Sequence, residues 1–260
     1  MELQGRAALV TGAGSGIGKA AALRLAREGC NVACLGRDHD DVCLTLEQIE
    51  RAGGRAIPVF ADVAQPEQME RACNQVGEAW GRIDIVFANA GINGVWAPLE
   101  ELEPEEWDKT MSVNLKGTFL TVKYALPWLR RQGGSVIITS SVNGNRIFSN
   151  TGATAYSCSK AGQVAFAKMA ALELARHHIR VNVICPGAIQ TNISENTEQR
   201  DLSEIKIPVE YPEGQIPLTG NTPGSADQVA ELVLFLASDR SGHISGTEVY
   251  IDGAQSLLQG

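Results

Sequence analysis

Tyr156 and Lys160 are the two side chains whose types and spacing could do the most demanding chemistry in this sequence. Residues i and i+4 share one face of a helix, so the phenol and the ammonium are predicted to lie side by side. A free phenol has a pKa of about 10, and lowering it to about 7 requires roughly 4 kcal/mol. An ammonium about 4 Å away supplies about that much at an effective dielectric constant of about 20. We therefore expect Lys160 to make Tyr156 a proton donor and acceptor for a reacting carbonyl or alcohol.

Two hydroxyls precede this pair at the end of an apolar run that reads as a buried strand. The run covers Ser135 to Thr139, and Ser140 and Ser141 follow it directly. A hydroxyl at this place can orient a carbonyl oxygen and stabilise the charge that grows on it. The residues alone leave both serines open as candidates.

A glycine-rich turn follows the first apolar run of the chain. Ala7 to Val10 leads into Thr11 and the glycines at positions 12, 16 and 18, a spacing that differs from G-x-G-x-x-G. A strand, a glycine-rich turn and a helix in this order aim backbone N–H groups at an anion. A nucleotide phosphate site together with a Tyr/Lys/Ser cluster predicts a hydride-transfer enzyme. The predicted contacts from this turn are Gly12, Ser15, Gly16, Ile17 and Gly18.

Short apolar runs alternate with segments of helical period along the whole chain, which suits one domain of 260 residues. This alternation predicts an α/β fold of the Rossmann type, with a doubly wound, parallel, seven-stranded sheet spanning 1–260. Strands are expected at 7–11, 31–36, 55–61, 83–89, 134–140, 179–185 and 247–251. Helices are expected at 16–29, 39–53, 66–80, 104–131, 153–177 and 225–238.

The interval from about 191 to 223 breaks this alternation. It contains four prolines and several apolar residues, among them Ile205, Ile207 and Leu218. A loop this long after a strand's carboxyl end, where ligands bind in open α/β sheets, predicts a substrate lid rather than an inert excursion.

Composition excludes several classes of function. The net charge of −8 and the pI near 5.1 argue against a nucleic-acid partner or an anionic membrane. No apolar stretch is long enough to span a bilayer, and the first residues lack the layout of a signal peptide, so a cytoplasmic location is expected. The six cysteines contain no Cys-x-x-Cys and the histidines do not cluster usefully, so no metal site is predicted.

Taken together, these motifs resemble the short-chain dehydrogenase/reductase family, in its shorter, single-domain branch. The resemblance covers essentially the whole chain. It is carried by Thr11-Gly-x-x-x-Gly-x-Gly18, Asp62-Val63, Asn89-Ala90-Gly91, Asn114, Ser141, Tyr156-x-x-x-Lys160 and Pro186-Gly187-x-Ile189-x-Thr191.

The resemblance implies a role for each matched residue. Ser141, rather than Ser140, would bind the carbonyl oxygen, because it lies three residues before Gly144 as in the family pattern. Lys160 would also hold the nicotinamide ribose, and Asn114 would hold a water that links Lys160 to solvent. The remaining implied cofactor contacts are Asp62 and Val63 at the adenine, Asn89 and Gly91 at the adenosine ribose, and Pro186, Gly187, Ile189 and Thr191 at the nicotinamide.

The end of the second strand predicts NADP(H) as the cofactor, with NAD(H) as the alternative. NAD-preferring relatives close this strand with an acid, whereas here Gly36 closes it and Arg37 follows. A guanidinium can bind a 2′-phosphate through two hydrogen bonds. Counting about twenty residues from Gly18 reaches Asp38 instead, but an acid must sit at the strand end to reach the ribose.

Three functions are in competition. The leading prediction is a reductase of small-molecule ketones, or the reverse secondary-alcohol dehydrogenase. The second is a 3-oxoacyl-carrier-protein reductase, for which Arg130, Arg131 and Arg176 are candidate docking residues for an acidic carrier. The third is a dinucleotide sensor without turnover. The resemblance also implies a homotetramer, with a dimer as the alternative, and the small residues of helix 153–177 permit close helix packing.

Overall fold

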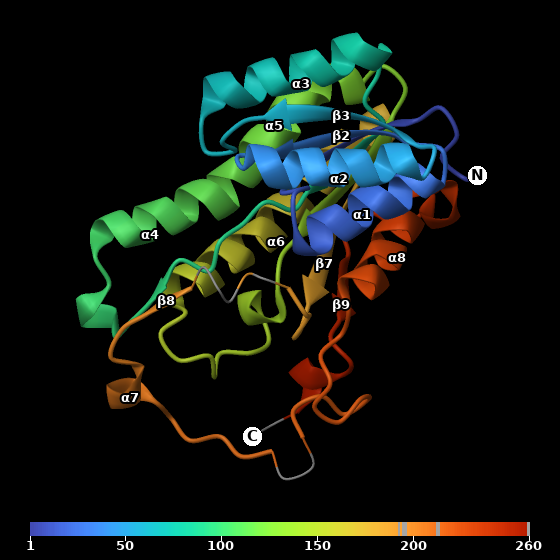
Figure 1. The fold of residues 1–260 in the computed structure, drawn as a ribbon. Helices are drawn as coiled ribbons and strands as arrows, with labels where there is room; N and C mark the ends of the chain where they lie inside the picture. The colour runs from blue at the N-terminus through green and yellow to red at the C-terminus, as the bar shows by residue number, and fades with distance from the viewer. Residues whose placement is uncertain (192, 194–196, 212–213, 259–260) are drawn as a thin grey trace.

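One parallel sheet of seven strands forms the centre of the molecule, in the order β3-β2-β1-β4-β6-β7-β9 (Figure 1). The computed structural model of the chain describes residues 1–191, 193, 197–211 and 214–258. The strands are β1 Ala7–Thr11, β2 Asn31–Gly36, β3 Arg55–Phe60, β4 Ile85–Ala88, β6 Gly134–Thr139, β7 Ile179–Pro186 and β9 Glu248–Ile251. All neighbouring pairs are parallel, which confirms the predicted doubly wound α/β fold.

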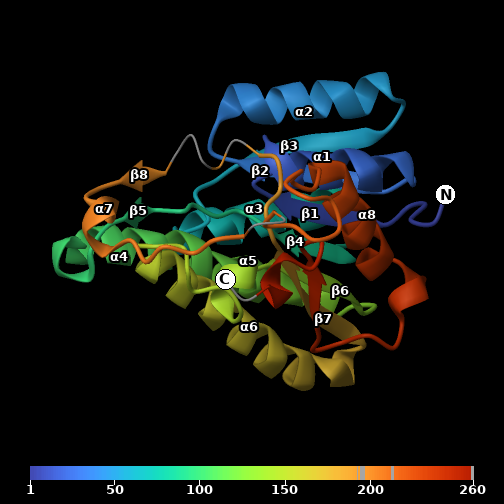
Figure 2. The ribbon, with the colours of Figure 1, turned by 90° about the horizontal axis from the view of Figure 1, so that it is seen from below.

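Helices cover both faces of the sheet, as Figure 2 shows edge-on. One face is covered by α1 (Gly16–Arg27), α2 (His39–Arg51) and α8 (Ala226–Ala237), whose buried residues form one apolar cluster with strand side chains. The other face is covered by α3 (Pro66–Trp80), α5 (Gly117–Leu129) and α6 (Thr154–Leu174), which form a second cluster. Because apolar strand residues are buried on both sides, the strands read as continuous apolar runs.

The strand order reverses between β1 and β4, because β2 and β3 lie on one side of β1 and the later strands lie on the other. Ligands of open α/β sheets bind beyond the carboxyl ends of the strands at such a reversal. The glycine turn after β1, Asn89 after β4 and Ser141 after β6 all lie at this edge.

The predicted helix 104–131 is wrong as a single regular helix. It consists of α4 (Pro104–Met111), a π-helical turn (Ser112–Lys116) and α5, which ends at Leu129. A π-turn adds one residue to a helical turn and is frequent at functional sites. It places the carbonyl of Asn114 where the side chain of Gln163 on α6 donates to it.

The sequence analysis also missed the short elements around the predicted lid. β5 (Val95–Trp96) pairs in parallel with β8 (Glu198–Gln199), and α7 (Leu202–Ile205) follows. Figure 2 shows β8 and α7 beside β5 at one end of the molecule. Arg200 ties this segment to α4 through Glu106, at 2.9 Å, and to the Glu101 carbonyl at 2.6 Å. Residues 192, 194–196 and 212–213 of the predicted lid lie outside the described residues.

Among the helices that the structure describes, none has the length and apolar character required to cross a bilayer. The cytoplasmic location expected from the sequence stays a prediction.

Candidate active site

The glycine turn between β1 and α1 is shaped by close backbone contacts. Gly12 and Gly16 have positive φ angles of 67° and 50°, which side chains rarely adopt. A Cβ on Gly18 would overlap the Gly12 carbonyl oxygen and would lie 2.7 Å from Asn89 Nδ2. The N-terminus of α1 therefore comes close enough to the turn for backbone N–H groups to meet a pyrophosphate, so the turn fits a dinucleotide.

We expect Gly18→Ala to weaken cofactor binding at least about tenfold, which corresponds to about 1.4 kcal/mol. The added methyl must displace the Gly12 carbonyl, which is rigid backbone. Cofactor affinity is measured by quenching of tryptophan fluorescence. Gly53→Ala is the matched control, since Gly53 has a φ of 79° and open space around its Cβ position. It should lower thermal stability without changing affinity, and equal affinity losses in both variants would contradict the steric reason.

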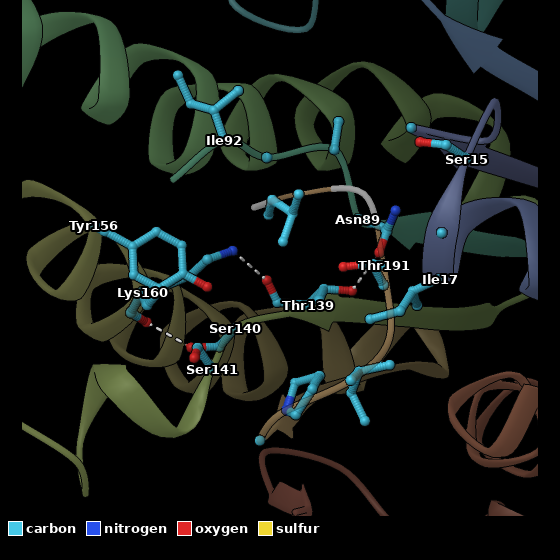
Figure 3. Close-up of a pocket in the computed structure, with 18 residues that line it drawn as sticks. Ser15, Ile17, Asn89, Ile92, Thr139, Ser140, Ser141, Tyr156, Lys160 and Thr191 are labelled. Atoms are coloured by element: carbon cyan, nitrogen blue, oxygen red, sulfur yellow. Dashed lines mark hydrogen bonds between the residues drawn. The ribbon is translucent and has the colours of Figure 1, made fainter. Parts of the chain in front are cut away.

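A central cavity of about 250 Å³ brings together most of the predicted site residues (Figure 3). Tyr156, Lys160 and Ser141 lie at one end, and Ser15, Ile17, Asn89 and Thr191 lie toward the other. The predicted residues that line it are Gly12, Ser15, Gly16, Ile17, Asn89, Gly91, Ser141, Tyr156, Lys160, Pro186, Gly187, Ile189 and Thr191.

A second cavity of about 160 Å³, the side cavity, shares Gly12 and Gly91 with the central one. Arg37, Asp62 and Val63 line it, as a site for the adenosine half would require. Gly18 and Asn114 line neither cavity: Gly18 supports the turn from inside α1, and Asn114 is buried behind Gly91.

Ser140 and Ser141 differ in their partners. The Ser140 hydroxyl is buried and donates to the Lys160 carbonyl at 2.8 Å, so it holds α6 against the end of β6. The Ser141 hydroxyl lines the central cavity beside Tyr156 and lowers the pKa of that phenol; it accepts from the Asn143 backbone N–H at 3.2 Å and donates to Asn143 Oδ1 at 3.4 Å. Of the two serines, Ser141 is therefore the one whose hydroxyl meets the phenol.

Lys160 is almost completely buried, at 4 % exposure, and its ammonium donates to the Thr139 carbonyl at 2.9 Å. Burial lowers the pKa of Lys160 to about 8. Burial also raises the pKa of Tyr156, and the hydrogen bond from Ser141 only partly opposes this effect. The predicted lowering of the Tyr156 pKa by Lys160 is therefore not seen: the ammonium lies 5.5 Å from the ring centroid and donates to the Thr139 carbonyl instead.

Asn114 is fixed on every side. Its amide brackets Ile92, accepting from the Ile92 N–H at 2.8 Å and donating to the Ile92 carbonyl at 2.9 Å. Its own backbone carbonyl accepts from Gln163 Nε2 at 2.9 Å and from Thr118 Oγ1 at 2.8 Å. Asn114 Oδ1 and Lys160 Nζ lie 3.2 and 3.5 Å from the position of a Cβ on Gly91, and the water implied by the family resemblance stays a prediction.

The segment after β7 closes the cavity from the other side. A Cβ on Gly187 would lie 2.7 Å from Asp252 Cβ, so only a glycine fits at this position. Ile189 pairs with Gly224 in an isolated bridge, which holds the start of the predicted lid. Thr191 packs against Gly16, so this segment contacts the glycine turn directly.

Sequence reasoning missed several residues that position the site. Thr11 Oγ1 accepts from the Asn89 and Ala90 amides at 3.0 and 3.1 Å, and Thr139 Oγ1 donates to Asn89 Oδ1 at 3.1 Å. Thr11 is the last residue of β1 and Thr139 is the last residue of β6. A threonine at the carboxyl end of an apolar run is visible in the sequence and could have indicated both residues. No cluster of three or more metal-ligating side chains occurs in the part of the chain that the structure describes.

Comparisons with known proteins agree with this site. A family model described as enoyl-(acyl carrier protein) reductase matches residues 12–254. The chain is 36% identical to a 3-oxoacyl-[acyl-carrier-protein] reductase of Thermotoga maritima, over 97% of this chain and 98% of that protein. It is 36% identical to the levodione reductase of Leifsonia aquatica, over 96% and 94% of the two chains. A solved 3-ketoacyl-ACP reductase of Sinorhizobium meliloti superposes with a TM-score of 0.94, at 53% identity, over 97% of this chain and all of that one.

The chain belongs to the short-chain dehydrogenase/reductase family. It is an NAD(P)-dependent oxidoreductase that acts on carbonyl or alcohol substrates, which sets the non-catalytic sensor aside.

Proposed function

We propose that the protein interconverts a small-molecule ketone and its secondary alcohol with NADP(H), and that Tyr156 is the general acid and base. One observation carries this proposal: Ser141, Tyr156 and Lys160 line the same cavity as the glycine turn, so a carbonyl, a proton donor and a dinucleotide can meet there. The dinucleotide supplies the hydride when it is bound. Side chains of the protein orient the carbonyl and supply the proton.

In carbonyl reduction, Ser141 orients the carbonyl oxygen and Tyr156 delivers a proton to it as the oxygen gains charge. The raised pKa of Tyr156 keeps the phenol protonated at neutral pH, which suits this direction. Lys160 and the Asn89–Gly91 loop would hold the nicotinamide and adenosine riboses, and Ile189 and Thr191 the nicotinamide. Asp62 and Val63 would contact the adenine.

The preference for NADP(H) is supported by the side cavity. Arg37 lines it, is exposed, and has no ion-pair partner within the described ranges. The Asp38 carboxylate caps α2 by accepting from the Asp41 amide at 3.0 Å, so it is engaged away from a ribose. Gly36 closes β2 without a charge.

We expect wild-type kcat/KM to be higher with NADPH than with NADH, and Gly36→Asp with Arg37→Ile to reverse that order. The change replaces a phosphate-binding cation with a phosphate-repelling anion, an effect of about 1.5–3 kcal/mol. A Cβ on Gly36 would lie 2.7 Å from Val42 Cγ2, so Gly36→Ala is needed as the steric control. A wild-type preference for NADH would contradict the assignment.

The segment from about 191 to 223 remains our proposed substrate lid. A cavity of about 240 Å³ lies between the 147–151 loop and the lid residues Lys206, Ile207, Val209 and Tyr211. Leu202 of α7 lies against Gly152, four residues before Tyr156. A lid seated on these residues would exclude water from the reacting oxygen.

Reduction of a 3-oxoacyl thioester is the second candidate, because the solved relative at 53% identity bears that activity in its name. The residues suggested for carrier docking do not support it. Arg130 and Arg131 follow α5 just before β6, and Arg176 lies just before β7, so all three sit at the amino edge of the sheet. The cavity opens at the carboxyl edge.

An absorbance assay at 340 nm separates the candidates when the purified protein is supplied with NADPH or NADH and ketones, acetoacetyl-CoA or an acetoacetyl carrier protein. A ketone turned over faster than both thioesters supports the proposal. A carrier thioester preferred over the ketones by tenfold or more would establish the second candidate instead.

The homotetramer stays a proposal, supported by apolar side chains exposed on α5 and α6. Phe119, Met169 and Leu172 are 42%, 72% and 81% exposed, more than a lone helical face of a monomer usually presents. Light scattering should give about four times the 27.7 kDa of one chain, and a monomer mass would contradict it.

A further inference from the structure

Gln163 on α6 is a completely buried polar side chain that the reaction steps above do not use. Its Nε2 donates to the Asn114 carbonyl at 2.9 Å and to Thr118 Oγ1 at 2.7 Å. Its Oε1 is buried and has no hydrogen-bond partner among the residues described. Burying an acceptor without a hydrogen-bond partner lowers the stability of the fold. The glutamine is therefore a poor choice for stability alone, which points to a role in placing Asn114.

Three side chains fix the π-turn that contains Asn114. Gln163 and Ser159 lie one turn apart on the same face of α6. Gln163 binds the Asn114 carbonyl, and Ser159 Oγ accepts from Asn114 Nδ2 at 3.0 Å. Thr118 donates to the same carbonyl at 2.8 Å while accepting from Gln163. The turn is held to the helix that also carries Tyr156 and Lys160.

Asn114 in turn holds a part of the wall of the central cavity. Both hydrogen bonds of its amide to Ile92 fix the Gly91–Ile92 segment, which lines that cavity. A Cβ on Gly91 would have Asn114 Oδ1 and Lys160 Nζ as its two nearest atoms, at 3.2 and 3.5 Å. A rotation of the Asn114 backbone would therefore move the cavity wall against the ammonium of Lys160.

We propose that Gln163 is a positioning residue for the hydride-transfer reaction: its amide locks the Asn114 carbonyl, and so fixes the Gly91–Ile92 wall and the neighbouring Lys160. The inference rests on the proposed function for its effect on turnover. The contact itself can be tested without cofactor or substrate.

The first test is amide hydrogen exchange of the cofactor-free protein, followed at the Ile92 N–H. Gln163→Met and Thr118→Val should each raise the exchange rate of Ile92 at least about tenfold relative to amides in β2. Thr121→Val is the matched control, because Thr121 is equally buried and makes the same kind of bond, to the Gly117 carbonyl at 2.7 Å. It should leave Ile92 unchanged. Equal exchange at Ile92 in wild type and Gln163→Met would overturn the proposal.

The second test uses the pH dependence of kcat in Gln163→Glu. A protonated carboxylic acid can donate to the Asn114 carbonyl and a carboxylate cannot, and burial raises the pKa of a glutamate into the accessible range. We expect kcat of this variant to fall at least about tenfold more than wild type between pH 6 and 9, with recovery at low pH. Gln163→Met should lose activity equally at every pH. A loss in Gln163→Glu that does not vary with pH would mean a structural role only.

The two tests separate this inference from the proposed function. A wild-type protein that reduces no carbonyl would refute the proposed function while hydrogen exchange still decides the Gln163 contact. An active wild type whose kcat and Ile92 exchange both ignore Gln163→Met would refute the inference alone.

Discussion

Tyr156→Phe should lower kcat for carbonyl reduction by about a thousandfold or more while leaving cofactor affinity within about twofold. General acid catalysis contributes about 10²–10⁴ to such rates, and the Tyr156 phenol lines the cavity together with Ser141 and Lys160. The ring keeps its packing, so folding should change little. Stopped-flow absorbance in a single turnover separates the chemical step from product release.

Tyr124→Phe is the control for this variant. Tyr124 lies on α5 away from both cavities, so its hydroxyl should be dispensable. Residual activity of Tyr156→Phe within about tenfold of wild type would contradict the assignment of Tyr156 as the general acid. Because burial raises the pKa of Tyr156, wild-type alcohol oxidation should also accelerate as pH rises, whereas carbonyl reduction should not.

Lys160→Met should reduce both kcat and cofactor affinity, each by about tenfold or more, because the ammonium faces Gly91 and lies beside the phenol. Methionine keeps the length of the apolar stem, so the loss reports the charge. Equilibrium binding of NADPH and initial rates measure the two effects independently. Unchanged affinity would remove the ribose-binding role and leave only the electrostatic one.

The same variant has a distinct signature in stability. The folded-state pKa of Lys160, about 8, lies below its ordinary value of 10.5, so the folded protein binds this proton less tightly than the unfolded chain. The charged amine therefore destabilises the fold below pH 8, and this cost disappears as pH rises toward 10.5. We expect Lys160→Met to match or exceed wild type in thermal stability at pH 7. The wild type should gain on the variant between pH 8 and 10.

The sheet and its covering helices could be predicted because their residues are locally consistent. Apolar runs such as Val136–Ile138 leave no alternative to a strand buried on both faces. The π-turn at 112–116 could not be predicted, since it depends on two side chains of α6: Ser159 accepts from the Asn114 side chain and Gln163 donates to the Asn114 carbonyl. The two-residue pair β5–β8 carries no periodicity and forms only where the lid meets the chain after β4.

Site residues could be predicted from the sequence where only one residue type fits the position. They could not be predicted where the role of a side chain depends on which hydrogen-bond partner the fold brings to it. Gly18 had to be a glycine next to the turn, and the structure explains why. Lys160 was expected to bond electrostatically to the phenol, but the Thr139 carbonyl competes for its ammonium. Ser159 stands inside the Tyr156–Lys160 motif and was passed over, because only the fold reveals that it faces Asn114.

The ion pair between Arg200 and Glu106 limits which segments of this protein can be exchanged with those of its relatives. This ion pair joins the segment that contains β8 and α7 to α4, and α4 continues directly into the π-turn that contains Asn114. A cassette that exchanges residues after β7 to change substrate range would have to travel with the stretch around Glu101 and Glu106. A graft that kept only one side of this contact would leave a cation or a carboxylate without its ion-pair partner, so the two segments have to be exchanged together.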